Sequence, residues 1–113
     1  MTDNGGPGIG PGPDRVGYPS ALVAVKRVHV LVSGDVQRVG FRWYCRGEAM
    51  ARQVGGWIRN LPDGRVEAEF EGDPSAVHAM VEWCRHGPTW ARVTDVEVAD
   101  VDPTGETKFG IGR

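Results

Sequence analysis

The chain has 113 residues, of which 40% are hydrophobic and 25% charged, with a formal net charge of −2 at pH 7. These values suit one domain with one core and exclude an intrinsically disordered protein. The small negative charge gives no general reason to bind nucleic acid or an anionic membrane, and no apolar run reaches the length of a membrane span. We therefore expect a cytoplasmic protein that contacts neither, and any affinity for anions has to come from a local site.

Residues 1–24 are predicted to form a flexible tail. Their first 20 positions hold six glycines and four prolines and almost nothing apolar that a core could bury. A proline-rich recognition arm is the functional alternative, but the prolines lack the P-x-x-P spacing of such ligands. Residues 25–113 are therefore assigned to the folded domain.

The folded domain begins with an alternating apolar pattern. Val28, Val30 and Val32 lie two residues apart, which predicts a strand over residues 26–33 with one buried face. A turn with two glycines follows at residues 34–41, and glycine lets the backbone fold tightly there.

A helix is predicted next, over residues 42–54, and a pair of glycines follows its end. Cys45 falls on the polar side of this helix. We expect its core-facing stripe to consist of Trp43, Gly47, Met50, Ala51 and Val54.

Two further strands are predicted over residues 57–61 and 65–71. The intervening Pro-Asp-Gly is a strong hairpin signal. Along the second of these strands apolar residues alternate with glutamates, which predicts one buried face and one wet, acidic face. The glutamates are Glu67, Glu69 and Glu71.

The last part of the domain is predicted to hold a second helix and two strands. Asp73 and Pro74 form an N-cap followed by proline at the first helical position, and the helix runs to about Arg85. A strand over residues 92–101 follows, and a short run at 108–111 can pair at a sheet edge. The buried stripe of the helix is expected to be Val77, Met80, Val81 and Cys84.

The element order β-α-β-β-α-β predicts an α+β, ferredoxin-like sandwich. Two helices cover one face of an antiparallel sheet, and the first and third strands lie at its centre. Cys84 is expected to face the core and Cys45 the solvent, so free thiols are favoured over a disulfide. The three histidines show no metal-ligand spacing with the cysteines, and we expect neither a metal nor a cofactor.

Three features near one end of the predicted sheet carry the chemistry. Backbone N–H groups of the turn can converge on an anion, helped by the positive end of the following helix. Arg42 adds a planar fork of donors suited to phosphate oxygens, and Asn60 on the second strand can orient a water. Each feature alone is more often structural, because many strand-helix turns carry glycine and most asparagines near turns satisfy backbone groups.

The turn reads GDVQRVGFR at residues 34–42, which resembles the acylphosphatase signature G-x-V-Q-G-V-x-F-R. GWIRN at residues 56–60, with Gly64, Val66 and Gly72 after it, resembles that family's second signature. The resemblance covers nearly the whole predicted domain. Two long motifs at the right separation are far more specific than one glycine pattern.

The resemblance implies a metal-free hydrolase that cleaves the carboxyl-phosphate bond of small acyl phosphates by water attack. It also implies a ferredoxin-like fold, in agreement with the element order. By motif position, Arg42 matches the phosphate-binding arginine and Asn60 the asparagine that positions the nucleophilic water. The phosphate cradle is matched by Val36, Gln37, Arg38, Val39, Gly40 and Phe41.

One departure from the signature is Arg38, which stands where the family has glycine. If the backbone there has positive φ, a side chain with a Cβ costs roughly 1–2 kcal/mol. Arg38 also brings a second positive charge to the mouth of the site. Our hypothesis is retained activity with altered substrate affinity.

Two other functions are open to this fold. An RNA-binding sheet would need stacking aromatics in a positive surround, whereas the open face here is predicted to be acidic. A non-catalytic module that holds phosphate in the same cradle is the stronger alternative. We expect a monomer, because no long apolar stripe is left over once the core is assigned.

Overall fold

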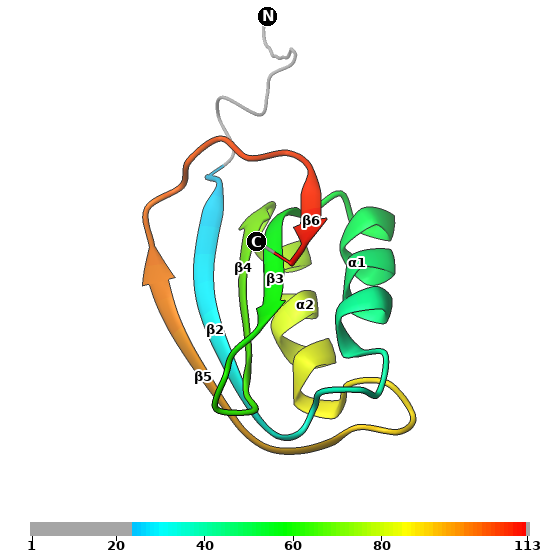
Figure 1. Ribbon diagram of the computed structural model, residues 1–113. Helices are drawn as coiled ribbons and strands as arrows, with labels where there is room; N and C mark the ends of the chain where they lie inside the picture. Colours follow the sequence, from blue (N-terminus) through cyan, green and yellow to red (C-terminus); the bar gives the residue numbers. More distant parts are fainter. Residues whose placement is uncertain (1–23, 113) are drawn as a thin grey trace, which may run out of the picture.

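The computed structural model describes residues 24–112, so the predicted tail of residues 1–24 lies outside the described residues except for its last position. The described part of the chain forms two helices and five strands (Figure 1). In chain order these are β2 (Lys26–Asp35), α1 (Phe41–Ala51), β3 (Gly55–Asn60), β4 (Val66–Gly72), α2 (Pro74–His86), β5 (Arg92–Val101) and β6 (Phe109–Ile111).

The strands form one sheet in the order β5-β2-β4-β3-β6, and both helices cover the same face of it (Figure 1). Strands β5, β2, β4 and β3 pair antiparallel, with β2 and β4 at the centre. The predicted ferredoxin-like α+β class is confirmed. The short C-terminal run also forms a strand, and it adds to the edge as β6, parallel to β3.

The core lies between the sheet and the helices, and strand alternation builds it. Val28 and Val30 on β2 are at most 2% exposed, and their antiparallel partners on β4 are Phe70 and Ala68. Because successive side chains point to opposite faces, these residues all face the helices. Burial of each large apolar side chain stabilises the fold by about 1.5–3 kcal/mol.

The buried face of α1 differs from the predicted one. The helix begins at Phe41, and its buried side chains are Phe41, Cys45 and Ala49, spaced four residues apart. Trp43 and Met50, which were expected in the core, are 67% and 56% exposed. The prediction followed the largest apolar side chains, but small residues at two of the three buried positions let α1 pack closely.

Cys45 therefore faces inward, not outward as predicted. Cys45 and Cys84 are both completely buried, and both are free thiols, as the sequence predicted. Burial raises the pKa of the Cys45 thiol well above its ordinary value, and its hydrogen bond with Cys84 raises it further. The Cys45 thiol of α1 thus contacts the Cys84 thiol of α2.

The open face of the sheet is ion-paired, which corrects the prediction of a wet, acidic face. Arg27 and Glu71 are only 3% and 4% exposed, and Arg27 Nη1 lies 2.7 Å from Glu71 Oε1. Arg27 also pairs with Glu69 at 2.7 Å and with Glu106 at 3.0 Å. The connection between β5 and β6 thereby covers one end of this face.

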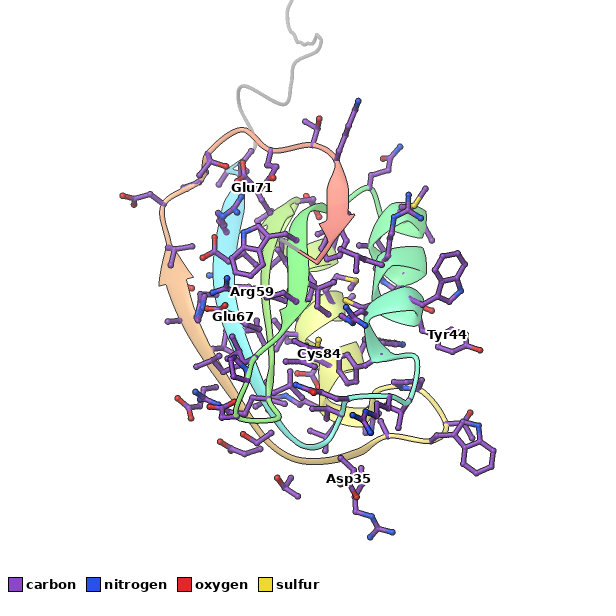
Figure 2. The ribbon with its side chains drawn as sticks, viewed as in Figure 1. Asp35, Tyr44, Arg59, Glu67, Glu71 and Cys84 are labelled. Carbon is purple, nitrogen blue, oxygen red and sulfur yellow. The ribbon has the colours of Figure 1, made fainter. Side chains whose placement is uncertain are left out.

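Glu67 occupies the other end of the same face. It accepts a hydrogen bond from Arg59 Nε at 2.6 Å, and its second oxygen lies 2.7 Å from His29 Nε2. Figure 2 shows Arg59 and Glu67 side by side on the sheet. Burial alone would raise the pKa of Glu67, but the hydrogen bonds and charges of these partners outweigh it and lower the pKa.

Candidate active site

The loop between β2 and α1, residues 36–40, lies at the same end of the sheet as the β3–β4 turn (Figure 1). Strand β2 reaches it through an irregularity in its pairing with β5 between Ser33 and Gly34. Gly34 has φ of +122°, and a Cβ there would lie 2.1 Å from the carbonyl oxygen of Arg92. Only glycine allows this close approach, which turns the chain sharply into the loop.

The loop backbone has a dihedral pattern that favours anion binding. Arg38 has φ of 63° and Gly40 has φ of 80°, so left-handed residues recur every second position. This pattern turns successive N–H groups toward one side, as in an anion-binding nest. Within the part of the chain that the structure describes, the N–H groups of residues 36–40 donate to no loop or turn carbonyl. They are available to an anion.

The N-terminus of α1 adds to these N–H groups. Gly40 is the N-cap and supplies no side-chain acceptor, and the first turn of the helix has no acidic residue. Most helices satisfy these first N–H groups with a capping side chain. Because α1 does not, the positive end of its dipole is left for a ligand.

A pocket of about 280 Å³ opens over the loop, close to the smallest volumes that hold small ligands. Six of the eight predicted site residues line it. A larger cleft of about 640 Å³ lies between the C-terminal end of α1 and β6, but none of the predicted residues line that one. The lining of the smaller pocket is Val36, Arg38, Gly40, Phe41, Arg42, Trp43, Asn60 and Ile111.

Two of the lining residues, Trp43 and Ile111, were missed by sequence reasoning. Trp43 follows Arg42 on the first turn of α1, and its pattern position suggested a core residue. Ile111 reaches the pocket because β6 pairs with β3, where Ile111 is opposite Ile58. The signal that could have found Trp43 is its place directly after the arginine of the turn.

Within the described residues, the two arginines of the pocket have no carboxylate partner. Among residues 24–112, no Asp or Glu forms an ion pair with Arg38 or Arg42. Arg27 and Arg59 on the open face, by contrast, are both ion-paired. A guanidinium without a partner can bind a phosphate with two parallel hydrogen bonds.

The other two predicted residues, Gln37 and Val39, do not line the pocket. Gln37 Nε2 donates to the carbonyl oxygens of Leu61 at 2.8 Å and Arg65 at 3.0 Å. These hydrogen bonds fasten the loop to the β3–β4 turn. Val39 packs against the core. Both side chains therefore hold the loop in place.

Asn60 is the last residue of β3 and shares the helix-side face with Ile58, two residues earlier. Its Oδ1 atom is buried and has no hydrogen-bond partner, a combination found at no other side chain among residues 24–112. An unpaired buried acceptor costs about 1–3 kcal/mol. Such atoms are rare, and here the acceptor lies beside the anion-binding loop. It is suited to accept a hydrogen bond from a water.

Residues 24–112 contain no cluster of three His, Cys, Asp or Glu side chains that could hold a metal ion. Nor does any helix there have the length and hydropathy to cross a membrane. The polar side-chain groups of the pocket are two guanidiniums, one carboxamide and the indole of Trp43.

This fold and site define a class, the small α+β proteins that bind a phosphate-like oxyanion at a strand-helix loop. The family model described as Acylphosphatase matches residues 28–111. The chain belongs to the acylphosphatase family.

Individual relatives agree with this assignment. An acylphosphatase from Syntrophobacter fumaroxidans is 56% identical over 81 residues, which are 72% of this chain and 84% of the relative. One from Methylococcus capsulatus is 50% identical over 90 residues, or 79% of this chain and 98% of the relative. The crystal structure of acylphosphatase from Bacillus subtilis matches with a TM-score of 0.75 and 36% identity, covering 78% of this chain and 99% of that one.

Proposed function

We infer that this chain is an acylphosphatase, which cleaves the carboxyl-phosphate bond of a small acyl phosphate with water and releases a carboxylate and inorganic phosphate. The observation that carries this inference is one pocket that joins three groups which lack partners among residues 24–112: an amide nest, an arginine without a carboxylate and a buried acceptor without a donor. The match of the family over residues 28–111 supports it.

In this proposal Arg42 and the amides of residues 36–41 hold the phosphoryl group. The guanidinium, the amides and the N-terminus of α1 all present positive charge, and the phosphoryl oxygens carry the negative charge of the transition state. Phosphoryl transfer asks a protein mainly for positioning and charge stabilisation. A rigid cradle supplies both, and Gln37 keeps the cradle rigid.

Asn60 orients the attacking water in the same proposal. Its Oδ1 accepts a hydrogen bond from the water and fixes it in line with the bond to be broken. The side chains that line the pocket include no His, Asp or Glu, so no strong general base is at hand. A carboxylate leaving group suits such a site, because its conjugate acid has a pKa of about 4 and it can leave without being protonated.

The test of this function is the hydrolysis of benzoyl phosphate in the presence of a chelator. We expect turnover by the natural chain, unchanged by the chelator, and a loss of at least about 10²-fold in kcat/KM for Arg42→Gln. The matched control is Arg52→Gln, which removes the same charge from the C-cap residue of α1, about 15 Å along the helix axis. Arg52 pairs there with Glu48, and its loss should leave turnover unchanged.

Binding of inorganic phosphate by the same samples separates the alternatives. Phosphate should compete with benzoyl phosphate in the natural chain and should bind much more weakly to Arg42→Gln. A natural chain that binds phosphate but hydrolyses no acyl phosphate would contradict the proposed function. It would favour the non-catalytic anion-binding module.

We further propose that the catalytic domain spans residues 25–113 and acts in the cytoplasm, as a monomer and without nucleic acid. Free buried thiols at Cys45 and Cys84 suit a reducing compartment. The carboxylates of β4 are ion-paired, so they do not by themselves repel RNA. RNA binding is disfavoured because the chain has no excess of positive charge.

The monomer proposal has its own support and test. The sequence predicted that no long apolar stripe would be left over, and the structure exposes three large side chains of α1, Trp43, Tyr44 and Met50. Figure 2 shows Tyr44 pointing away from the sheet. Trp43 lines the pocket, and the two others are single exposed apolar side chains of an ordinary kind. Sedimentation equilibrium at increasing concentration should give the mass of one chain; a concentration-dependent dimer would contradict the proposal.

A further inference from the structure

The guanidinium of Arg38 lines the pocket but has no task in the proposed chemistry, which uses only the backbone amide of this residue. Its backbone adopts φ of 63°, a left-handed conformation that costs a residue with a Cβ roughly 1–2 kcal/mol. Glycine would avoid this cost. The chain nevertheless places an arginine there, and its side chain is exposed at the pocket.

The pocket lining contains one more cation than the proposed phosphoryl cradle uses. In the proposed function the amide nest, the helix N-terminus and Arg42 hold the phosphoryl group. Arg38 adds a second guanidinium to the lining, and no carboxylate of residues 24–112 neutralises it. The described part of the chain therefore leaves one cation in excess of those that hold the phosphoryl group.

The lining also contains two exposed apolar side chains. Trp43 and Ile111 are 67% and 40% exposed, and both line the same pocket as Arg38. An indole ring offers a flat surface for a planar or aliphatic acyl body. A guanidinium beside such a surface offers two parallel hydrogen bonds to a carboxylate or a phosphate.

We propose that Arg38 is a specificity-determining residue, which favours acyl phosphates whose acyl group carries a second anionic group. Trp43 and Ile111 contact the acyl body, and the Arg38 guanidinium pairs with a carboxylate or a phosphate at its far end. This inference rests on the proposed hydrolysis of acyl phosphates. It concerns only the choice among them.

The experiment compares substrates that differ in one charge. The pair is 4-carboxybenzoyl phosphate and its neutral, nearly isosteric analogue 4-carbamoylbenzoyl phosphate, with benzoyl phosphate as the unsubstituted reference. A third compound, 4-(phosphonooxy)benzoyl phosphate, replaces the carboxylate with a phosphate. The measured quantity is the ratio of kcat/KM for each charged substrate to kcat/KM for the carbamoyl analogue. Differences in intrinsic reactivity cancel when this ratio is compared between variants.

The variants keep the backbone strain constant. Arg38→Gln and Arg38→Lys retain a Cβ at the left-handed position, and Arg52→Gln is the charge-matched control. We expect Arg38→Gln to lower the ratio about three- to tenfold, the range of a partly exposed charge pair. Arg38→Lys should keep most of the ratio, and Arg52→Gln all of it. Raising the ionic strength should lower the ratio of the natural chain but not that of Arg38→Gln.

The results distinguish a failure of the Arg38 proposal from a failure of the proposed function. The proposal is overturned if Arg38→Gln leaves the ratio unchanged, or if it lowers kcat/KM equally for charged and neutral substrates, since Arg38 would then serve the phosphoryl group alone. A natural chain that hydrolyses none of the substrates, benzoyl phosphate included, overturns the proposed function and this inference with it. Whichever charged substrate loses more in Arg38→Gln identifies the anionic group, carboxylate or phosphate, that the subsite prefers.

Discussion

Replacing Asn60 with alanine is expected to lower kcat for benzoyl phosphate by at least about 10²-fold while leaving the affinity for inorganic phosphate within about twofold. The loss follows from the position of the buried Oδ1, which is suited to hold the attacking water in line. The affinity is kept because the nest and Arg42, which hold the phosphoryl group, are unchanged. Steady-state kinetics and phosphate inhibition measure the two quantities.

The stability of Asn60→Ala provides an independent check. The natural carboxamide buries an acceptor that makes no hydrogen bond, so its removal should leave the free energy of unfolding unchanged or raise it by about 1 kcal/mol. Asn60→Asp is the matched variant of the same size. Its negative charge should repel phosphate and weaken both binding and turnover. If Asn60→Ala lost phosphate affinity in parallel with kcat, Asn60 would bind the phosphoryl group and not the water.

Replacing Arg27 with methionine is expected to lower the free energy of unfolding by about 3–5 kcal/mol, with benzoyl phosphate turnover retained where the domain is folded. Arg27 is 3% exposed, and its removal leaves the carboxylate of Glu71, which is 4% exposed, without its cation. Two backbone N–H groups, those of Thr104 and Gly105, would remain as its donors, each at 2.8 Å. Urea unfolding measures the change.

Two variants separate charge burial from packing. Arg59→Gln is the control, because Arg59 is 42% exposed and its pair with Glu67 should contribute at most about 1 kcal/mol. Adding Glu71→Met to Arg27→Met should recover much of the loss, because no unpaired charge then stays buried. If Arg27→Met and Arg59→Gln lowered the free energy of unfolding equally, the loss in Arg27→Met could not come from leaving the buried Glu71 carboxylate without its cation.

The same ion pair predicts how stability depends on pH. Burial alone would raise the pKa of Glu71, but hydrogen bonds from Thr104, Arg27 and Gly105 lower it below its usual 4.5. The unfolded chain therefore binds a proton at higher pH than the folded one. The stabilisation is complete above pH 4.5 and is lost as the pH falls through the folded pKa. Acid should destabilise the natural chain more steeply than Arg27→Met.

The sequence alone determined the order of the elements, the fold class and the two residues proposed for chemistry. Strand alternation has a period of two, so Val28 and Val30 could face only one way, and the hairpin signal fixed where β3 turns into β4. Arg42 and Asn60 were identified because two motifs specify them locally. Their meeting in one pocket followed from the topology, since the loop after β2 and the end of β3 lie at the same end of the sheet.

Only the tertiary structure decided the rest. The sequence of a helix with apolar residues on more than one side does not specify which side is buried. Packing against α2 and the sheet buries Cys45 and not Trp43, so Trp43 lies at the pocket. Glu71 looked solvent-exposed because nothing near it in sequence covers it. Its partners Arg27 and Thr104 lie 44 and 33 residues away. Local patterns carry no information on such contacts, because they form only when distant segments fold together.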